Sequence, residues 1–130
     1  MDAFAKVLEG DDPSVIGPLL LMRPYPSDHR LDEIYTIVHS VEAYPLDTYL
    51  EELMRVTEEL CRTSPYLLKT LLIRLLYTST DTDALIIKSA VLSPSAKACV
   101  ATIVASIKSA YPDPPDYVQH CDRLLRALEG

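Results

Sequence analysis

The chain has 130 residues, 48% of them hydrophobic and 24% charged, which predicts one water-soluble globular domain over residues 1–130. Its formal net charge of −7 disfavours direct binding to nucleic acid, because nucleic-acid-binding surfaces neutralise phosphates with lysine and arginine. The longest strongly apolar run, LLIRLL at 71–76, is far shorter than the ~20 residues needed to cross a bilayer, so we expect no membrane association.

The three cysteines, Cys61, Cys99 and Cys121, are widely spaced and include no C-x-x-C pair. An odd number at such spacing argues against a disulfide framework or a zinc site. We therefore expect free thiols that pack as small apolar groups, as in a reducing compartment. The N-terminal residues are acidic and do not resemble a signal peptide. The sequence therefore predicts a cytoplasmic protein.

Proline with a preceding polar residue marks the clearest helix starts. The chain has ten prolines and three glycines, and alternating β-branched runs are scarce, which disfavours a sheet-rich fold. Proline suits the first helical position, where its missing N–H costs nothing, and Asp or Ser before it caps the helix. The pattern occurs at Asp12 with Pro13, Ser64 with Pro65 and Ser93 with Pro94, and Pro115 opens the last helix.

Apolar residues at helical spacing fill the intervals between these starts. Leu31, Ile34 and Val38 recur on one face, and residues 46–60 continue the i, i+3, i+4, i+7 pattern. Residues 67–76 are apolar on most sides, which predicts a central buried helix. The expected helices span 2–9, 13–22, 29–43, 46–62, 65–78, 82–92, 94–110 and 115–128.

Short connections between these helices predict antiparallel hairpins. The predicted fold class is therefore all-α, with about eight helices. Hairpins of roughly 30 residues are typical of HEAT or armadillo repeats, whereas the weak similarity between the hairpins favours an irregular helical bundle. Both architectures remain open at this point.

His39 and Glu42 lie three residues apart and therefore share a helix face. A di-metal site in a bundle needs such a motif twice, and H-x-x-E occurs once. Helical periodicity places Glu42 on the apolar face, where a carboxylate needs a partner. Arg74, the one charged residue within LLIRLL, is the expected partner. We interpret His39, Glu42 and Arg74 as a structural polar network, with a buried pair whose disruption costs ~3–5 kcal/mol.

No catalytic motif is recognisable in the chain. There is no G-x-S-x-G nucleophile elbow and no glycine-rich phosphate loop. No cysteine has a histidine in the context of a known catalytic family. We therefore expect a protein that is not an enzyme and that needs no cofactor and no metal.

Negative charge is concentrated in the first half of the chain. Residues 1–63 carry 13 acids and 5 bases, a net charge of −8, whereas residues 64–130 carry 6 acids and 7 bases, a net charge of +1. An acidic surface favours a basic partner, and tyrosine is common in interfaces. Helix 94–110, rich in small apolar residues, is expected to serve core packing only. The predicted partner-binding residues are Tyr25, Asp28, Tyr44, Asp47, Glu51 and Glu52.

Three segments resemble a family of bacterial immunity proteins called immunity protein family thirty. They are YTIVHSVE at 35–42, YLEEL at 49–53 and SPYLLKTLLIRLL at 64–76. The resemblance covers roughly residues 28–108. Tyr66 and Tyr77 depart from it, since the family often has tryptophan and asparagine at these places.

The resemblance implies a cytoplasmic protein that binds the C-terminal domain of its cognate toxin, one to one and as a monomer, and neutralises it. Such toxins serve contact-dependent growth inhibition and related systems, and many are nucleases with basic clefts that an acidic helix can occupy. The resemblance also implies that His39, Glu42 and Arg74 maintain the fold, while contact surfaces vary. The alternative, from another class, is a helical-repeat adaptor or scaffold subunit of a larger complex.

Overall fold

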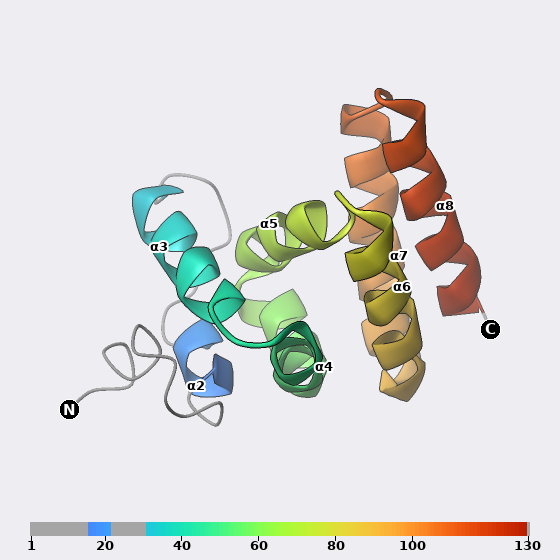
Figure 1. The fold of residues 1–130 in the computed structure, drawn as a ribbon. Helices are drawn as coiled ribbons and strands as arrows, with labels where there is room; N and C mark the ends of the chain where they lie inside the picture. The colour runs from blue at the N-terminus through green and yellow to red at the C-terminus, as the bar shows by residue number, and fades with distance from the viewer. Residues whose placement is uncertain (1–15, 22–30, 130) are drawn as a thin grey trace. The chain divides into compact units, whose positions relative to one another are not determined.

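The computed structural model of the chain describes residues 16–21 and 31–129. These ranges are helical and contain no strand (Figure 1), which confirms the all-α fold class. The helix expected at 2–9 lies outside the described residues. No helix within them is both long enough and apolar enough to cross a membrane. The elements are α2 (Ile16–Leu20), α3 (Leu31–Glu42), α4 (Leu46–Thr63), α5 (Pro65–Leu75), α6 (Ser79–Lys88), the 3-10 helix η2 (Ser89–Val91), α7 (Pro94–Ala110) and α8 (Pro115–Glu129).

Three helix starts follow the proline pattern of the sequence, and the first is α5, which begins at Pro65. α7 begins at Pro94, and the Ser93 side chain accepts a hydrogen bond from the Ala96 N–H at 3.2 Å. α8 begins at Pro115. A capping serine in front of proline satisfies a backbone donor that has no partner inside the helix.

A boundary differs from the prediction between α5 and α6. The helix predicted over 65–78 ends at Leu75, and the next begins at Ser79 rather than at residue 82. Thr78 is the reason, because its hydroxyl oxygen accepts a hydrogen bond from the Asp81 N–H at 3.1 Å. A threonine in this capping geometry starts a new helix instead of continuing the previous one.

The chain divides into two compact units, Met1–Leu68 and Lys69–Gly130. In the first unit α4 packs against α2 and α3. Gly17 permits the close approach of α2, because a Cβ there would lie 3.3 Å from Cγ1 of Val56. Leu53 and Leu60 of α4 are fully buried, and each buried leucine contributes about 1.5–3 kcal/mol. This inner face fixes which side of α4 remains in solvent.

The second unit is built around α8. α7 and α8 form an antiparallel hairpin, and α6 and η2 also pack on α8 (Figure 1). Val104 and Leu124 are fully buried in the core of this unit. The expectation that helix 94–110 serves core packing only is wrong, because Ala98 and Ala105 are exposed. Small residues continue round α7 onto its solvent side.

The cysteines only partly follow the expectation of free thiols. Cys121 is a buried free thiol. Burial and the nearby Asp122 carboxylate raise its pKa, so the thiol stays protonated and behaves as an apolar group. Cys61 and Cys99 are disulfide-bonded, so the expectation is wrong for these two. The argument from cysteines for a reducing compartment therefore loses its support.

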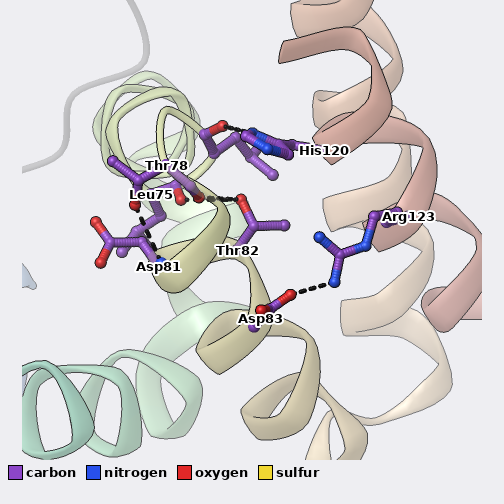
Figure 2. Close-up of polar contacts among 8 residues, drawn as sticks. Leu75, Thr78, Asp81, Thr82, Asp83, His120 and Arg123 are labelled. Carbon is purple, nitrogen blue, oxygen red and sulfur yellow. Dashed lines mark hydrogen bonds and ion pairs between the residues drawn. The ribbon is translucent and has the colours of Figure 1, made fainter. Parts of the chain in front are cut away.

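Side chains from α6 and α8 bind carbonyls at the C-terminal end of α5. Figure 2 shows Thr82 and His120 pointing toward this end. The Thr82 hydroxyl donates to the Thr78 carbonyl at 2.7 Å and lies 3.3 Å from the Leu75 carbonyl. His120 Nδ1 is 2.8 Å from the Leu76 carbonyl. Carbonyls at a helix end have no partner inside the helix, so the contacts to the Leu75 and Leu76 carbonyls stabilise the end of α5. The Thr78 carbonyl belongs to the start of α6 and also accepts a hydrogen bond from the Thr82 N–H at 3.1 Å.

A second set of contacts supports the same region. The Tyr117 hydroxyl donates to the Ile73 carbonyl at 3.0 Å. Burial raises the pKa of Tyr117, so the hydroxyl remains a donor at any physiological pH. The Tyr117 ring meets Tyr111 edge to face, with centroids 6.1 Å apart. Arg123 of α8 pairs with Asp83 of α6 (Figure 2). These contacts connect α8 to α5 and to α6.

Replacing Thr82 with valine is expected to lower the free energy of unfolding by about 1–2 kcal/mol, because the buried Leu75 carbonyl loses its hydrogen bond from the Thr82 hydroxyl. The matched control is Thr102→Val, which removes an exposed hydroxyl bonded to the Ala98 carbonyl at 3.0 Å and should change stability by less than about 0.5 kcal/mol. Urea denaturation of both variants measures the difference. Equal losses of unfolding free energy in the two variants would show that the hydrogen bonds of the Thr82 hydroxyl do not stabilise the fold.

Candidate protein-binding surface

A line of acidic side chains runs along the exposed side of α4. Successive residues of a helix are about 100° apart, so Asp47, Glu51 and Glu58 fall within about 40° of one another round its axis. All three are exposed, and we call them the acidic stripe. Leu53 and Leu60 point into the core, so the stripe is held toward solvent. Asp47 lies in the first turn of α4, where negative charge is favourable.

The two basic residues of α4 are paired with other acids of the same helix. Arg55 lies 3.2 Å from Glu52, and Arg62 pairs with Glu59. The hydrogen bond from Arg62 lowers the pKa of Glu59, and the same bond raises the pKa of Arg62. The sequence of α4 has five acids and two bases, which gives the helix a net charge of −3. The helix therefore presents a negative field to a partner.

The predicted partner-binding residues have different surroundings. Tyr25 and Asp28 lie outside the described residues. Tyr44 is only 5% exposed, so its predicted contact with a partner is wrong. It occupies the turn between α3 and α4, where its ring is buried instead of facing solvent. The Glu52 side chain is 16% exposed and pairs with Arg55, so it offers less surface than predicted.

Asp47 and Glu51 of the prediction are exposed, and Glu58 is exposed on the same face of α4. The sequence interpretation did not choose Glu58, although its i+7 spacing from Glu51 places it on the same face. Helical spacing alone was therefore sufficient to find it. The missing information was which side of α4 the core would cover.

The proposed polar network of His39, Glu42 and Arg74 is not buried. His39 Nδ1 lies 3.8 Å from Glu42 Oε1, with side chains 66% and 30% exposed, and Arg74 is exposed as well. The Glu42 and Arg74 side chains are therefore exposed and not buried as expected, and their pairing stays a prediction. Glu42 is the last residue of α3, where the helix ends and its periodicity no longer forces the side chain into the core.

This exposure changes the expected result of a mutation. Glu42→Ala should lower the free energy of unfolding by less than about 1 kcal/mol, because exposed ion pairs contribute little. His39→Ala, which removes the other member of the pair, should have an effect of similar size. Thermal and urea denaturation measure both. A loss of ~3 kcal/mol or more for Glu42→Ala would restore the buried-pair interpretation.

The stripe has the chemistry of a recognition surface. In the described part of the chain, no group of three or more His, Cys, Asp and Glu side chains is placed to hold a metal ion. Parallel carboxylates on a rigid helix attract a positively charged surface and speed its association. We therefore take the acidic stripe as the candidate site.

Comparison with protein-family models, curated proteins and solved structures finds no match to this chain. The resemblance to immunity proteins therefore depends on its three segments alone. Within them, Tyr49 and Leu53 are buried, whereas Tyr35 and His39 are exposed. The segments thus contain both core and surface residues.

Proposed function

We propose that this chain is an immunity-type protein that binds and neutralises a bacterial toxin domain through the acidic stripe of α4. One observation carries the proposal. Asp47, Glu51 and Glu58 are exposed along one side of a helix whose other side is buried. A rigid, charged helix face keeps its geometry on binding, which limits the entropy lost in association.

The chemistry of the stripe indicates the kind of toxin. A nuclease domain needs a basic cleft for the phosphates of its substrate. Carboxylates spaced along a helix complement such a cleft and exclude the nucleic acid from it. The resemblance to immunity proteins supports the same assignment and implies an encounter in the cytoplasm. The partner is then the C-terminal toxin domain of a larger protein.

The test begins with the gene that neighbours this one. We expect it to encode a large protein with a C-terminal toxin domain. An inactivated form of that domain, expressed with the full chain, should co-purify with it, one toxin domain for each copy of the chain. A neighbouring gene of another kind, or a toxin domain that elutes separately, would contradict the proposal.

Association should also depend on salt. The Debye length falls from about 30 Å at 0.01 M to about 8 Å at 0.15 M ionic strength. Over this range the association rate constant should fall by about 10-fold, because the stripe steers the encounter. Stopped-flow mixing measures the rate, and the melting temperature of the free chain serves as control. A rate constant that does not change with salt would indicate an apolar interface instead.

A second candidate function is supported by a different surface. Ile87 and Val91, at the end of α6 and in η2, are 72% and 78% exposed. Exposed apolar side chains of this size are typical of protein contacts. A scaffold subunit would use them to bind another subunit of a stable complex. The two candidates differ in one result, because a scaffold subunit gives cells no protection from a toxin.

A further inference from the structure

We propose that the chain forms a symmetric dimer through the groove between α7 and α8. The inference is independent of toxin binding and concerns the second unit alone. The groove has a volume of about 450 Å³. Its α7 side is lined by Lys97, Ala98 and Ala101, and its α8 side by Leu125, Leu128 and Glu129.

The two sides of the groove are opposite in charge. Lys97 lies on the α7 side and Glu129 on the α8 side, and within the described ranges neither side chain has an ion-pair or hydrogen-bond partner. Farther along the same two helices, Lys108 and Asp122 pair at 2.6 Å. An ion pair thus connects α7 and α8 at Lys108 and Asp122, whereas Lys97 and Glu129 at the groove do not pair with each other.

The two sides are also opposite in size. Ala98 and Ala101 leave room on the α7 side, whereas Leu125 and Leu128 are bulky on the α8 side. Side chains pack well when large groups meet small ones. A partner surface that suits this groove therefore needs leucines opposite α7 and alanines opposite α8. It also needs an acid opposite Lys97 and a base opposite Glu129.

A second copy of the chain meets these requirements. A two-fold axis that runs along the groove places α8 of the second copy over α7, and α7 of the second copy over α8. Leu125, which is partly exposed, then meets an alanine of the other copy, and Lys97 meets Glu129 of the other copy, twice. Because α7 and α8 are antiparallel, the four helices form an alternating antiparallel bundle, which is a favourable packing.

The size of the groove predicts the strength of the dimer. A stable interface buries at least about 1,200 Å², which is more than this groove supplies. We therefore expect a weak dimer that forms at high protein concentration. This differs from the monomer expected from the sequence.

Sedimentation equilibrium of the full chain, from low micromolar to millimolar concentration, tests the proposal. The wild-type chain should shift from monomer to dimer. Lys97→Glu and Glu129→Lys should each weaken the dimer by about 10-fold, because each puts like charges opposite one another twice. An equimolar mixture of the two variants should regain wild-type association, since both contacts of the mixed dimer are then complementary.

Ala98→Arg gives a second test, because a large side chain fills the groove without reversing the charge pair. It should keep the chain monomeric, with the circular dichroism spectrum and melting temperature unchanged. A wild-type chain that stays monomeric throughout overturns the proposal. So does a dimer that tolerates all three substitutions, or a variant mixture that does not regain association, since another surface would then be responsible.

Discussion

Leu53→Ala is expected to lower the free energy of unfolding by about 3–5 kcal/mol, because it removes a fully buried side chain and leaves a cavity. Leu53 is 0% exposed and lies on the face of α4 opposite the acidic stripe. Because the same helix presents the stripe, partner binding should fall in proportion to the fraction of unfolded chain. Urea denaturation followed by circular dichroism measures the change.

Leu46→Ala is the matched control for this result. Leu46 is the first residue of α4 and is partly exposed, so its truncation should cost less than about 1 kcal/mol. The two variants lose the same atoms from the same helix. If both variants lowered the free energy of unfolding equally, burial of the inner face of α4 would not be what stabilises this helix.

Reversing Glu51 and Glu58 together to lysine is expected to weaken binding of the toxin domain by about 10–100-fold. The two side chains lie near one another on the exposed side of α4, so both would face a basic partner. Asp47 is left unchanged, because its place in the first turn stabilises the helix. Isothermal titration at low ionic strength measures the affinity.

The control for net charge is the double reversal Asp113→Lys with Asp116→Lys. Both residues are exposed in the second unit, and each pair of reversals adds four charges to the net −7, giving −3. The control should change affinity by less than about 3-fold, because it changes the net charge by the same amount and leaves the acidic stripe intact. Equal losses in the two double variants would mean that total charge decides binding and that the stripe is not the site.

The helices of this chain were largely predictable because their signals are local. Serine before proline starts α7, and apolar spacing fills the rest of the chain. The error at residue 78 came from a competing local signal, since Thr78 caps α6. A polar side chain such as that of threonine can either continue a helix or cap the next one, and the surrounding backbone geometry determines which of the two occurs.

Burial of single residues was less predictable, because it depends on which elements meet. Tyr44 was expected to contact a partner and is buried, whereas Glu42 was expected to be buried and is exposed. Both lie where α3 ends and α4 begins. Helical periodicity does not extend through a turn, so it does not predict whether a side chain there is buried or exposed.

Contacts between distant segments were not predictable from the sequence. His120 contacts the Leu76 carbonyl across 44 positions of the chain. The groove likewise depends on how α7 and α8 are paired, since Ala98 and Leu125 become neighbours only in the folded hairpin. The sequence alone predicts two helices and does not show which of their side chains become neighbours. The acidic stripe was easier to find, because all of its members belong to a single helix.

The most direct test of the central proposal is survival of cells that express the toxin domain of the neighbouring gene together with this chain. The wild-type chain and the Asp113 and Asp116 variant should restore growth, whereas the Glu51 and Glu58 variant, present at the same level, should not. Full protection by the Glu51 and Glu58 variant would contradict the assignment of the stripe. Absence of protection by the wild-type chain would contradict the immunity function itself.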